Sequence, residues 1–366
     1  MNEREQVILD LIRNNPYITQ LDLAERLNLS RSAIAGYIST LTKAGHIIGR
    51  AYVLNESRKV LCIGGANIDR KAKLVQDFQW QDSNPVHVSD SAGGVARNIA
   101  ENLSKLLIPT SLLTVIGNDQ ASEVIWESSS LIDRSPSIEK QGQRTGTYTA
   151  VLNNDNEMVF ALADMDIYDS VSTEDLNLAS SHLRAAEMLI LDTNFPKNVL
   201  REIIQNKQKD QVLALVPVSS KKMNRVPDSL EQIDFIIFNE EELKSASKRY
   251  LIDSSLDTIE QMDEILKLGV KNVIVTNGKN GVTFKTEMGE HGSLAALPVS
   301  VKDVTGAGDA FAAGVIYGLY HELPLREACK YGIQLAKFTI ETDESVAKNL
   351  NETFFMDKDP LEQGGE

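Results

Sequence analysis

Apolar residues near the start of the chain recur at the three- and four-residue spacing of short amphipathic helices. Val7, Ile8, Leu11 and Ile12 form one such stripe, and Asn15-Pro16 ends it because proline cannot continue a helix. The pattern predicts a first short helix here, and the apolar positions that follow predict two more.

The second and third helices are marked by residues that cap helix N-termini. Thr19, with Asp22 three positions later, has the arrangement of a capping box, and Ser30 can cap the third helix. We expect residues 46–54 to form a two-stranded wing that turns at Gly49. The apolar stripe of the third helix consists of Ile34, Ile38 and Leu41.

This first segment differs in charge from the rest of the chain. Residues 1–57 contain six Lys or Arg and six Asp or Glu, so they sum to zero, whereas the 366 residues together have a formal net charge of −15. The acidic remainder argues against nonspecific binding of nucleic acid there. We expect a boundary at a short polar linker, with a body over residues 58–350 and a poorly ordered tail over residues 351–366.

The segment resembles the winged helix-turn-helix of bacterial regulators over nearly all of residues 1–57, because two helices, a tight turn, a third helix and a wing follow one another in that order. The resemblance implies DNA binding through an outward-facing third helix, whose small residues approach a groove while basic side chains meet phosphates. The segment also fits a helical dimerisation module with a solvated polar face, and its zero net charge keeps that alternative open. The candidate DNA-binding residues are Arg31, Ser32, Lys43 and Arg50.

From Val60 onward, short apolar runs alternate with helical patterns, which predicts a doubly wound, mostly parallel α/β sheet with helices on both faces. Thr147–Leu152 and Met158–Leu162 lack a crossover helix and predict a β-hairpin. That hairpin is a candidate lid element. We expect the whole lid to comprise about residues 67–92 and 144–166. The predicted strands include Val60–Ile63, Ser111–Ile116, Met188–Leu191, Val212–Val216, Phe235–Phe238 and Val273–Thr276.

Composition narrows the class of protein. No apolar run approaches the roughly 18 residues that a membrane span needs, and the start of the chain shows no signal-peptide pattern. Cys62 and Cys329 are far apart and form neither a disulfide framework nor a metal cluster, as a reducing compartment allows. We therefore expect a cytoplasmic protein without membrane contact.

The strongest chemical signal is the segment Asp303–Gly314, in which a Gly-Ala-Gly turn precedes an apolar helical run. Such a turn exposes backbone N–H groups at a helix N-terminus, where the helix dipole also favours an anion. We expect the amides of Gly306, Ala307 and Gly308 to hold a transferring phosphoryl group and Asp309 to deprotonate the attacking hydroxyl. A glycine-rich loop with a capping aspartate is the plainer alternative. The turn is neither a P-loop nor a dinucleotide-binding fingerprint, which disfavours hydride transfer.

Two further segments join small residues to polar ones. Gly93 and Gly94 precede an apolar helix, so the backbone can approach a ligand and Asn98 can point toward it. Asn67 and Asp69 follow the first strand and share one side of an extended segment, which suits the binding of vicinal hydroxyls. Simple turns with polar side chains explain each segment equally well.

Other segments are candidates for the nucleotide side of a site. Glu242 follows a predicted strand and fits either a helix N-terminus, where acids are favoured, or the hydration shell of Mg²⁺. Residues 276–281 follow another strand and can line nucleotide phosphates, although a plain turn explains them almost as well. The candidate cofactor-binding residues are Thr276, Gly278, Gly281, Thr305 and Asn239.

Taken in this order, the motifs resemble those of the ribokinase-like (PfkB) carbohydrate kinases, over residues 60 to about 345. The most specific marks are the Gly-Gly-x-x-x-Asn that starts at Gly93 and the Asp-x-x-Gly-Ala-Gly-Asp that starts at Asp303. The resemblance implies an α/β three-layer sandwich with a small β lid, ATP and Mg²⁺ as cofactors with a monovalent cation as a further candidate, and phosphorylation of a primary sugar hydroxyl. It implies Asp309 as the base, the turn amides as the anion hole, and Asn239 with Glu242 as Mg²⁺ and phosphate support. The implied substrate contacts are Asn67, Asp69, Gly93, Gly94 and Asn98.

Within that family the chain looks most like pseudouridine kinases, in residues 82–85, 93–100 and 164–167. It departs from them at Val216–Ser219, where those kinases tend to have Asp-Pro-Val-Ser with a carboxylate. We expect an ATP-dependent homodimer that phosphorylates the ribose 5′-hydroxyl of a nucleoside, pseudouridine first, with purine nucleosides or a sugar as alternative acceptors. The alternative class is a DNA-binding regulator whose kinase-like body only senses such a ligand. An intact Asp309 and anion hole favour the enzyme.

Overall fold

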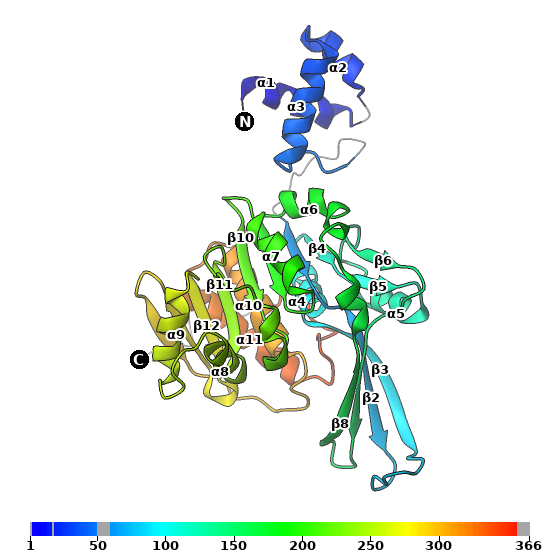
Figure 1. Cartoon of the computed structure of the whole chain (residues 1–366), viewed down its shortest axis with the longest axis vertical. Coiled ribbons are helices and arrows are strands. Elements are labelled where there is room, and N and C mark those ends of the chain that lie inside the picture. The colour runs from blue at the N-terminus through cyan, green and yellow to red at the C-terminus, as the bar shows by residue number, and fades with distance from the viewer. Residues whose placement is uncertain (1, 17, 50–58, 357–366) are drawn as a thin grey trace.

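A computed structural model describes residues 2–16, 18–49 and 59–356 (Figure 1). In these ranges the α-helices are α1 Glu3–Asn14, α2 Gln20–Leu27, α3 Arg31–Lys43, α4 Val95–Lys105, α5 Gln120–Ser128, α6 Ser180–Ala185, α7 Lys197–Gln205, α8 Glu240–Arg249, α9 Thr258–Lys267, α10 Ala307–Tyr320 and α11 Leu325–Ile340. The strands are β1 Val60–Ile63, β2 Asn67–Leu74, β3 Val86–Gly93, β4 Thr110–Leu113, β5 Val115–Gly117, β6 Ile138–Lys140, β7 Thr147–Leu152, β8 Met158–Asp164, β9 Met188–Asp192, β10 Val212–Val216, β11 Phe235–Asn239, β12 Asn272–Thr276, β13 Val282–Thr286 and β14 His291–Leu294. Within the described ranges, none of the helices combines the length and the apolarity that crossing a membrane requires.

The three N-terminal helices are capped as the sequence predicts. The Thr19 hydroxyl accepts the N–H of Asp22 at 3.1 Å, and the Asp22 carboxylate accepts the N–H of Thr19 at 3.1 Å. Ser30 Oγ accepts the N–H of Ala33 at 3.1 Å. The predicted wing over residues 46–54 lies largely outside the described part of the chain. The small core of this module buries the predicted α3 stripe, Ile34, Ile38 and Leu41, against α1 and α2.

The body is built on an eight-stranded sheet with the strand order β14-β13-β12-β11-β10-β9-β1-β4. The strands from β12 to β4 are parallel, and β13 and β14 are antiparallel. Along β1, Val60 and Cys62 face a core with α4, α10 and α11, whereas Leu61 and Ile63 face a core with α7, α8 and α9. Burial on both faces explains why these strands read as continuous apolar runs. The predicted three-layer α/β sandwich is confirmed.

A four-stranded sheet protrudes from the body, in the order β3-β2-β7-β8 (Figure 1). Its β7 and β8 form the antiparallel hairpin that the sequence predicts, while β2 pairs in parallel with β7 and antiparallel with β3. Asp119 fastens the base of this sheet, because its carboxylate caps α5 through Ser122 and accepts the N–H and hydroxyl of Thr145 at 2.8 and 2.6 Å. The chain enters β7 two residues later, so the protruding sheet grows from an anchored segment.

One predicted strand is wrong. Ser111–Ile116 is divided at Thr114 into β4 and β5. The first half stays at the edge of the large sheet beside β1, and the second half turns away to pair in parallel with β6. An unbroken apolar run carries no signal for this change of partner, which depends on where β6 lies.

The prediction of a poorly ordered tail from residue 351 is also wrong for its first residues. Phe354 and Phe355 are only 9% and 6% exposed. The Phe355 ring lies 4.7 Å from the ring of Tyr317 on α10 and 4.6 Å from that of Tyr331 on α11, measured between centroids. Phe354 and Phe355 therefore pack on this helix pair and belong to the core.

Candidate active site

A buried carboxylate lies where β1 and β9 end. Asp192, the last residue of β9, is 1% exposed and accepts the backbone N–H groups of Gly65 at 2.7 Å, Ala96 at 3.1 Å and Asn194 at 2.7 Å. Burial raises the pKa of Asp192, and these hydrogen bonds together with the Lys222 ammonium oppose that rise. The carboxylate therefore holds together the turn after β1, the start of α4 and the end of β9, which form the floor of the candidate site. Asp192 is not among the residues predicted from the sequence, although an acid at the end of a buried strand is a usable signal.

Glycine is required at two positions above this floor. Gly94 caps α4 with φ 100°, and an added Cβ would lie 2.4 Å from the carbonyl oxygen of Gly65. At Gly93 an added Cβ would lie 2.0 Å from Asp69 Oδ2. The glycine pair therefore lets the end of β3 and the start of α4 approach the turn after β1 closely.

Asn67 and Asp69 lie on one face at the start of β2. Asn67 Nδ2 donates to Asp69 Oδ1 at 2.7 Å, while Asp69 Oδ2 lies over Gly93. Burial raises the pKa of Asp69, and the Asn67 hydrogen bond and the cations of Arg97 and Lys71 oppose that rise. The sequence-predicted pair is thus assembled as one unit, with a carboxylate available to accept hydroxyl groups.

The Gly-Ala-Gly turn opens α10, with Gly306 as its left-handed N-cap. Gly306 has φ 78°, and an added Cβ there would lie 2.2 Å from the carbonyl oxygen of Ser345. Asp309 is the third residue of α10, and Asn98 Nδ2 donates to its Oδ2 at 2.7 Å. The fold therefore brings together two glycine-containing motifs whose polar residues are 211 positions apart in the chain.

Burial raises the pKa of the Asp309 carboxyl group to about 7. Burial contributes most to this rise, the carboxylates of Asp192, Asp69 and Glu242 add to it, and the hydrogen bond from Asn98 opposes it. A carboxylate whose pKa lies near neutrality is suited to accept a proton from an attacking hydroxyl.

Arg97, to which the sequence analysis assigned no role, holds Asn98 in place. Its buried Nη1 donates to Asn98 Oδ1 and to the carbonyl oxygen of Ala92, both at 2.9 Å, and its Nη2 pairs with Glu101. Because the Asn98 oxygen faces this donor, the Asn98 amide nitrogen faces Asp309. Burial lowers the pKa of Arg97 to about 10, so the guanidinium stays charged at neutral pH. An arginine inside an apolar helical run is the signal that identifies such a residue.

A cavity of about 710 Å³ opens beside the turn, with Ala307 and Gly308 in its lining. Its volume is in the range of small-molecule sites, and most of its wall is apolar, which suits a flat base. Thr305 is not among the lining residues, and its hydroxyl donates to Asp303 Oδ1 at 2.7 Å. The sequence-predicted cofactor residues that line the cavity are Asn239, Thr276, Gly278 and Gly281.

Glu242 lies behind this cavity at the start of α8. It is 5% exposed and forms a capping box with Asn239, in which each side chain accepts the other's N–H at 2.9 Å. Burial raises the pKa of Glu242 to about 7. The capping box uses one carboxylate oxygen, so the helix-cap role does not conflict with support of a hydrated cation by the other.

Comparison with known proteins decides the family. The model of the pfkB family carbohydrate kinases matches residues 57–351, and that of a winged helix-turn-helix DNA-binding family matches residues 1–48. The chain belongs to the pfkB family of carbohydrate kinases. It is therefore an ATP-dependent sugar or nucleoside kinase, with an N-terminal winged helix-turn-helix.

Three similar proteins illustrate the relationship. The uncharacterized sugar kinase YeiI of Escherichia coli is 30% identical over 339 residues, which cover 92% of this kinase and 93% of that protein. The pseudouridine kinase of Escherichia coli is 29% identical over 282 residues, which cover 76% of this kinase and 89% of that protein. The solved structure of a carbohydrate kinase from Agrobacterium tumefaciens has 28% identity and a TM-score of 0.70, and covers 82% of this kinase and 96% of that chain.

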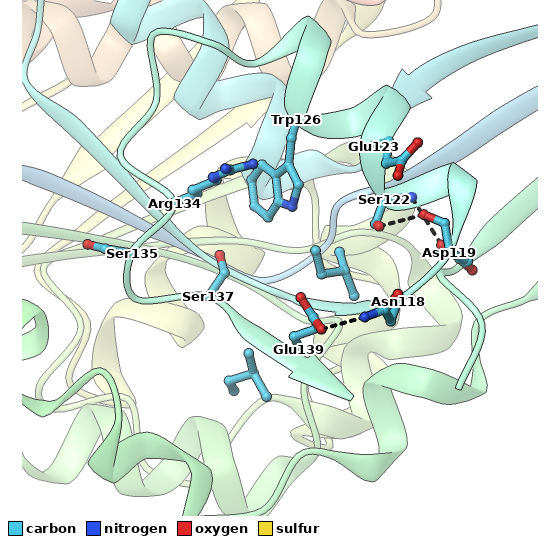
Figure 2. Close-up of a pocket in the computed structure, with 11 residues that line it drawn as sticks. Asn118, Asp119, Ser122, Glu123, Trp126, Arg134, Ser135, Ser137 and Glu139 are labelled. Atoms are coloured by element: carbon cyan, nitrogen blue, oxygen red, sulfur yellow. Dashed lines mark hydrogen bonds between the residues drawn. The ribbon is translucent and has the colours of Figure 1, made fainter. Parts of the chain in front are cut away.

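A second cavity of the kinase, of about 440 Å³, lies between α5 and the small sheet of β5 and β6. Figure 2 shows Arg134 beside Trp126, with its guanidinium carbon 5.7 Å from the ring centroid, and Asn118, which donates to Glu139 at 3.0 Å. None of its lining residues was predicted to bind acceptor or nucleotide.

The third helix of the winged helix-turn-helix carries the predicted DNA-binding residues on its surface. Arg31, Ser32 and Lys43 of α3 are exposed, and so is Gly36 between them. An added Cβ at Gly36 would meet nothing within 4 Å, so the helix backbone is open to the surroundings at this position. Arg50 lies outside the described residues.

Proposed function

We propose that this kinase phosphorylates the ribose 5′-hydroxyl of a nucleoside, with pseudouridine as the preferred acceptor and Asp309 as the general base. The bond between the γ-phosphorus of ATP and the bridging oxygen breaks as the bond to the 5′-oxygen forms. The hydroxyl proton passes to Asp309, ADP leaves, and the amides of Gly306, Ala307 and Gly308 stabilise the charge on the phosphoryl oxygens.

The contact between Asn98 and Asp309 carries this proposal. It joins the acceptor-side segment, with Asn67 and Asp69, to the turn beside the nucleotide-sized cavity. A base at that junction lies between the two substrates, and its pKa of about 7 matches the task.

The inner face of the protruding sheet favours a nucleoside over a bare sugar. Asp69 has Ser91 on β3 and Tyr148 on β7 as its register partners, so their side chains share one face with it. Two register positions further along the sheet, Ser89 on β3 continues that polar face. A nucleobase attached to a ribose at Asp69 would find hydrogen-bonding groups there, whereas ribose alone would leave them unused. The similarity to Escherichia coli pseudouridine kinase gives independent support.

Mg²⁺ and ATP are the proposed cofactors, with a monovalent cation as a further candidate. Among the described residues, no group of three or more His, Cys, Asp or Glu gathers as a metal site. Mg²⁺ keeps several waters and takes substrate phosphates with one or two carboxylates, so Glu242 fits as a support to its hydration shell. ATP use and two free, buried cysteines support a cytoplasmic location.

The acceptor is tested by an ATP-consumption screen of the purified protein with pseudouridine, uridine, inosine, guanosine, adenosine, ribose and fructose 6-phosphate. Pseudouridine is expected to give the highest kcat/KM, with phosphate on the 5′-oxygen as read by ³¹P NMR. Asp309→Asn serves as the control, and its kcat is expected to fall by at least about 10²-fold. A clear preference for inosine or guanosine would reassign the acceptor, and near-normal turnover of the variant would remove Asp309 from the mechanism.

We also propose that the winged helix-turn-helix binds DNA and that the protein acts as a homodimer. The exposed Arg31, Ser32 and Lys43 on α3 support DNA binding, and a dimer can present two such helices roughly 34 Å apart, one turn of DNA.

The DNA proposal is tested by gel retardation of genomic fragments from the gene's neighbourhood at low salt. The double variant Arg31→Ala with Lys43→Ala is expected to lose binding and keep kinase turnover. Arg4→Ala on α1 is the matched control, because it removes one exposed cation of the same module away from α3. Absence of retardation by the intact protein, with and without acceptor, would favour a dimerisation module. Light scattering measures the oligomeric state.

A further inference from the structure

Lys71 spans the two halves of the site. It follows Asn67 and Asp69 at alternate positions of β2, so all three side chains leave the same face of the strand. Its ammonium donates to Asp303 Oδ2, at the start of the glycine-rich turn and 232 positions away in the chain. The side chain therefore runs from the acceptor-side strand to the segment that holds the phosphoryl group.

Asp303 accepts hydrogen bonds from the Lys71 cation and from Thr305 of the turn at the same time. Its Oδ1 accepts the N–H and the hydroxyl of Thr305 at 2.8 and 2.7 Å, while its Oδ2 accepts the Lys71 ammonium. Although burial opposes it, these partners hold the pKa of Asp303 below its usual range, so the carboxylate stays ionised. The ammonium is thereby kept three residues before the turn amides even without substrate.

The site otherwise concentrates negative charge. The carboxylates of Asp69, Asp192 and Glu242 all act on Asp309, and the substrates bring phosphate oxygens. Phosphoryl transfer spreads negative charge over three equatorial oxygens, and the protein accelerates the reaction mainly by positioning and by charge stabilisation. A cation at the junction of acceptor and turn would stabilise this developing negative charge most effectively.

Other cations near the site are held by partners outside the glycine-rich turn. Arg97 is buried below Asn98 and donates to Glu101 and neighbouring oxygens. Lys222 donates to Asn194. The side chain of Lys71 is 34% exposed, so its flexible stem can turn toward a bound phosphoryl group. Two other lysines line the nucleotide cavity rather than the acceptor strand, namely Lys279 and Lys337.

We propose that Lys71 is a catalytic residue that stabilises the transferring phosphoryl group, and that Asp303 positions its ammonium for this role. The inference rests on the proposed function of Asp309 and the turn. As the bond from the γ-phosphorus to ADP breaks and the bond to the acceptor oxygen forms, the ammonium shares its protons between Asp303 and a phosphoryl oxygen. The acceptor's proton still goes to Asp309, and Lys71 remains protonated throughout.

The first test compares Lys71→Met with Arg70→Met in the full-length protein. Arg70 is the adjacent cation on β2, points to the opposite face and pairs with Asp90 at 2.8 Å, so its loss controls for charge and strand effects. Lys71→Met is expected to lower kcat by at least about 10²-fold, as loss of one transition-state donor does, with the acceptor KM within about threefold of normal. Arg70→Met is expected to retain normal kcat.

A second test separates charge from shape. Methylammonium added to Lys71→Ala is expected to restore part of kcat, because it returns a cation to the cavity left by the side chain. A normal kcat in Lys71→Met, or a defect confined to the acceptor KM, overturns the proposal. If Lys71→Met keeps its rate while Asp309→Asn is inactive, the proposed function stands and the role of Lys71 falls. If Asp309→Asn is active, the proposed function itself fails.

Discussion

Removing the Asn98 amide tests directly whether Asp309 is the base. Asn98 Nδ2 donates to Asp309 Oδ2 at 2.7 Å and stabilises the charged carboxylate. In Asn98→Ala, burial and the neighbouring carboxylates would act on Asp309 without this opposing bond. The pKa of Asp309 must therefore rise, and the base must be deprotonated at a higher pH.

The size of the shift follows from the hydrogen bond. A bond to a charged group contributes about 1.5–3 kcal/mol, and about 1.4 kcal/mol corresponds to one pKa unit, so the pKa should rise by about one to two units. The acid limb of kcat/KM should then move from about 7 to about 8–9. At neutral pH the deprotonated fraction, and with it kcat/KM, should fall by about five- to fiftyfold.

The assay is the pH dependence of kcat/KM for the acceptor, which reports ionisations of the free enzyme. Asn102→Ala is the matched control, because Asn102 is buried one turn further along α4 and donates to the Asn98 carbonyl at 2.9 Å without contacting Asp309. Its acid limb should stay near that of the unaltered protein. A uniform loss of rate in Asn98→Ala with an unmoved acid limb would refute the reasoning and leave Asn98 as an acceptor contact alone.

Three further variants test the architecture around the site. Arg97→Met should lower the free energy of unfolding by about 3–5 kcal/mol, because it leaves Glu101 buried without its main cation. Urea unfolding measures this free energy, and a loss below about 1 kcal/mol would contradict the prediction. Gly93→Ala should raise the acceptor KM by about ten- to hundredfold, because overpacking costs about 1–3 kcal/mol. The new methyl group would lie 2.0 Å from Asp69 Oδ2. An unchanged KM would place the acceptor elsewhere. Phe355→Ala should lower the free energy of unfolding by about 3–5 kcal/mol with little effect on KM, and a fully stable variant would show that Phe355 does not pack as described.

Patterns that depend on neighbours along the chain could be predicted from the sequence alone. The capping residues Thr19 and Ser30, the buried strands such as Val60–Ile63 and the hairpin over 147–162 all follow from periodicity and local hydrogen bonding. The turn before Asp309 was found in the same way, because backbone N–H groups at a helix start are a local feature.

Contacts between distant segments were decided by the tertiary structure. Asp192 and the Lys71–Asp303 pair act through partners that only the strand order β9-β1-β4 and the protruding sheet bring near them. The burial of Phe354 and Phe355 depends in the same way on the pairing of α10 with α11. A periodic pattern states which face of an element is buried, but the partner that buries it is set by packing many elements together. For that reason the motifs of this kinase can be recognised along the chain, whereas only the packed fold settles which of their side chains meet.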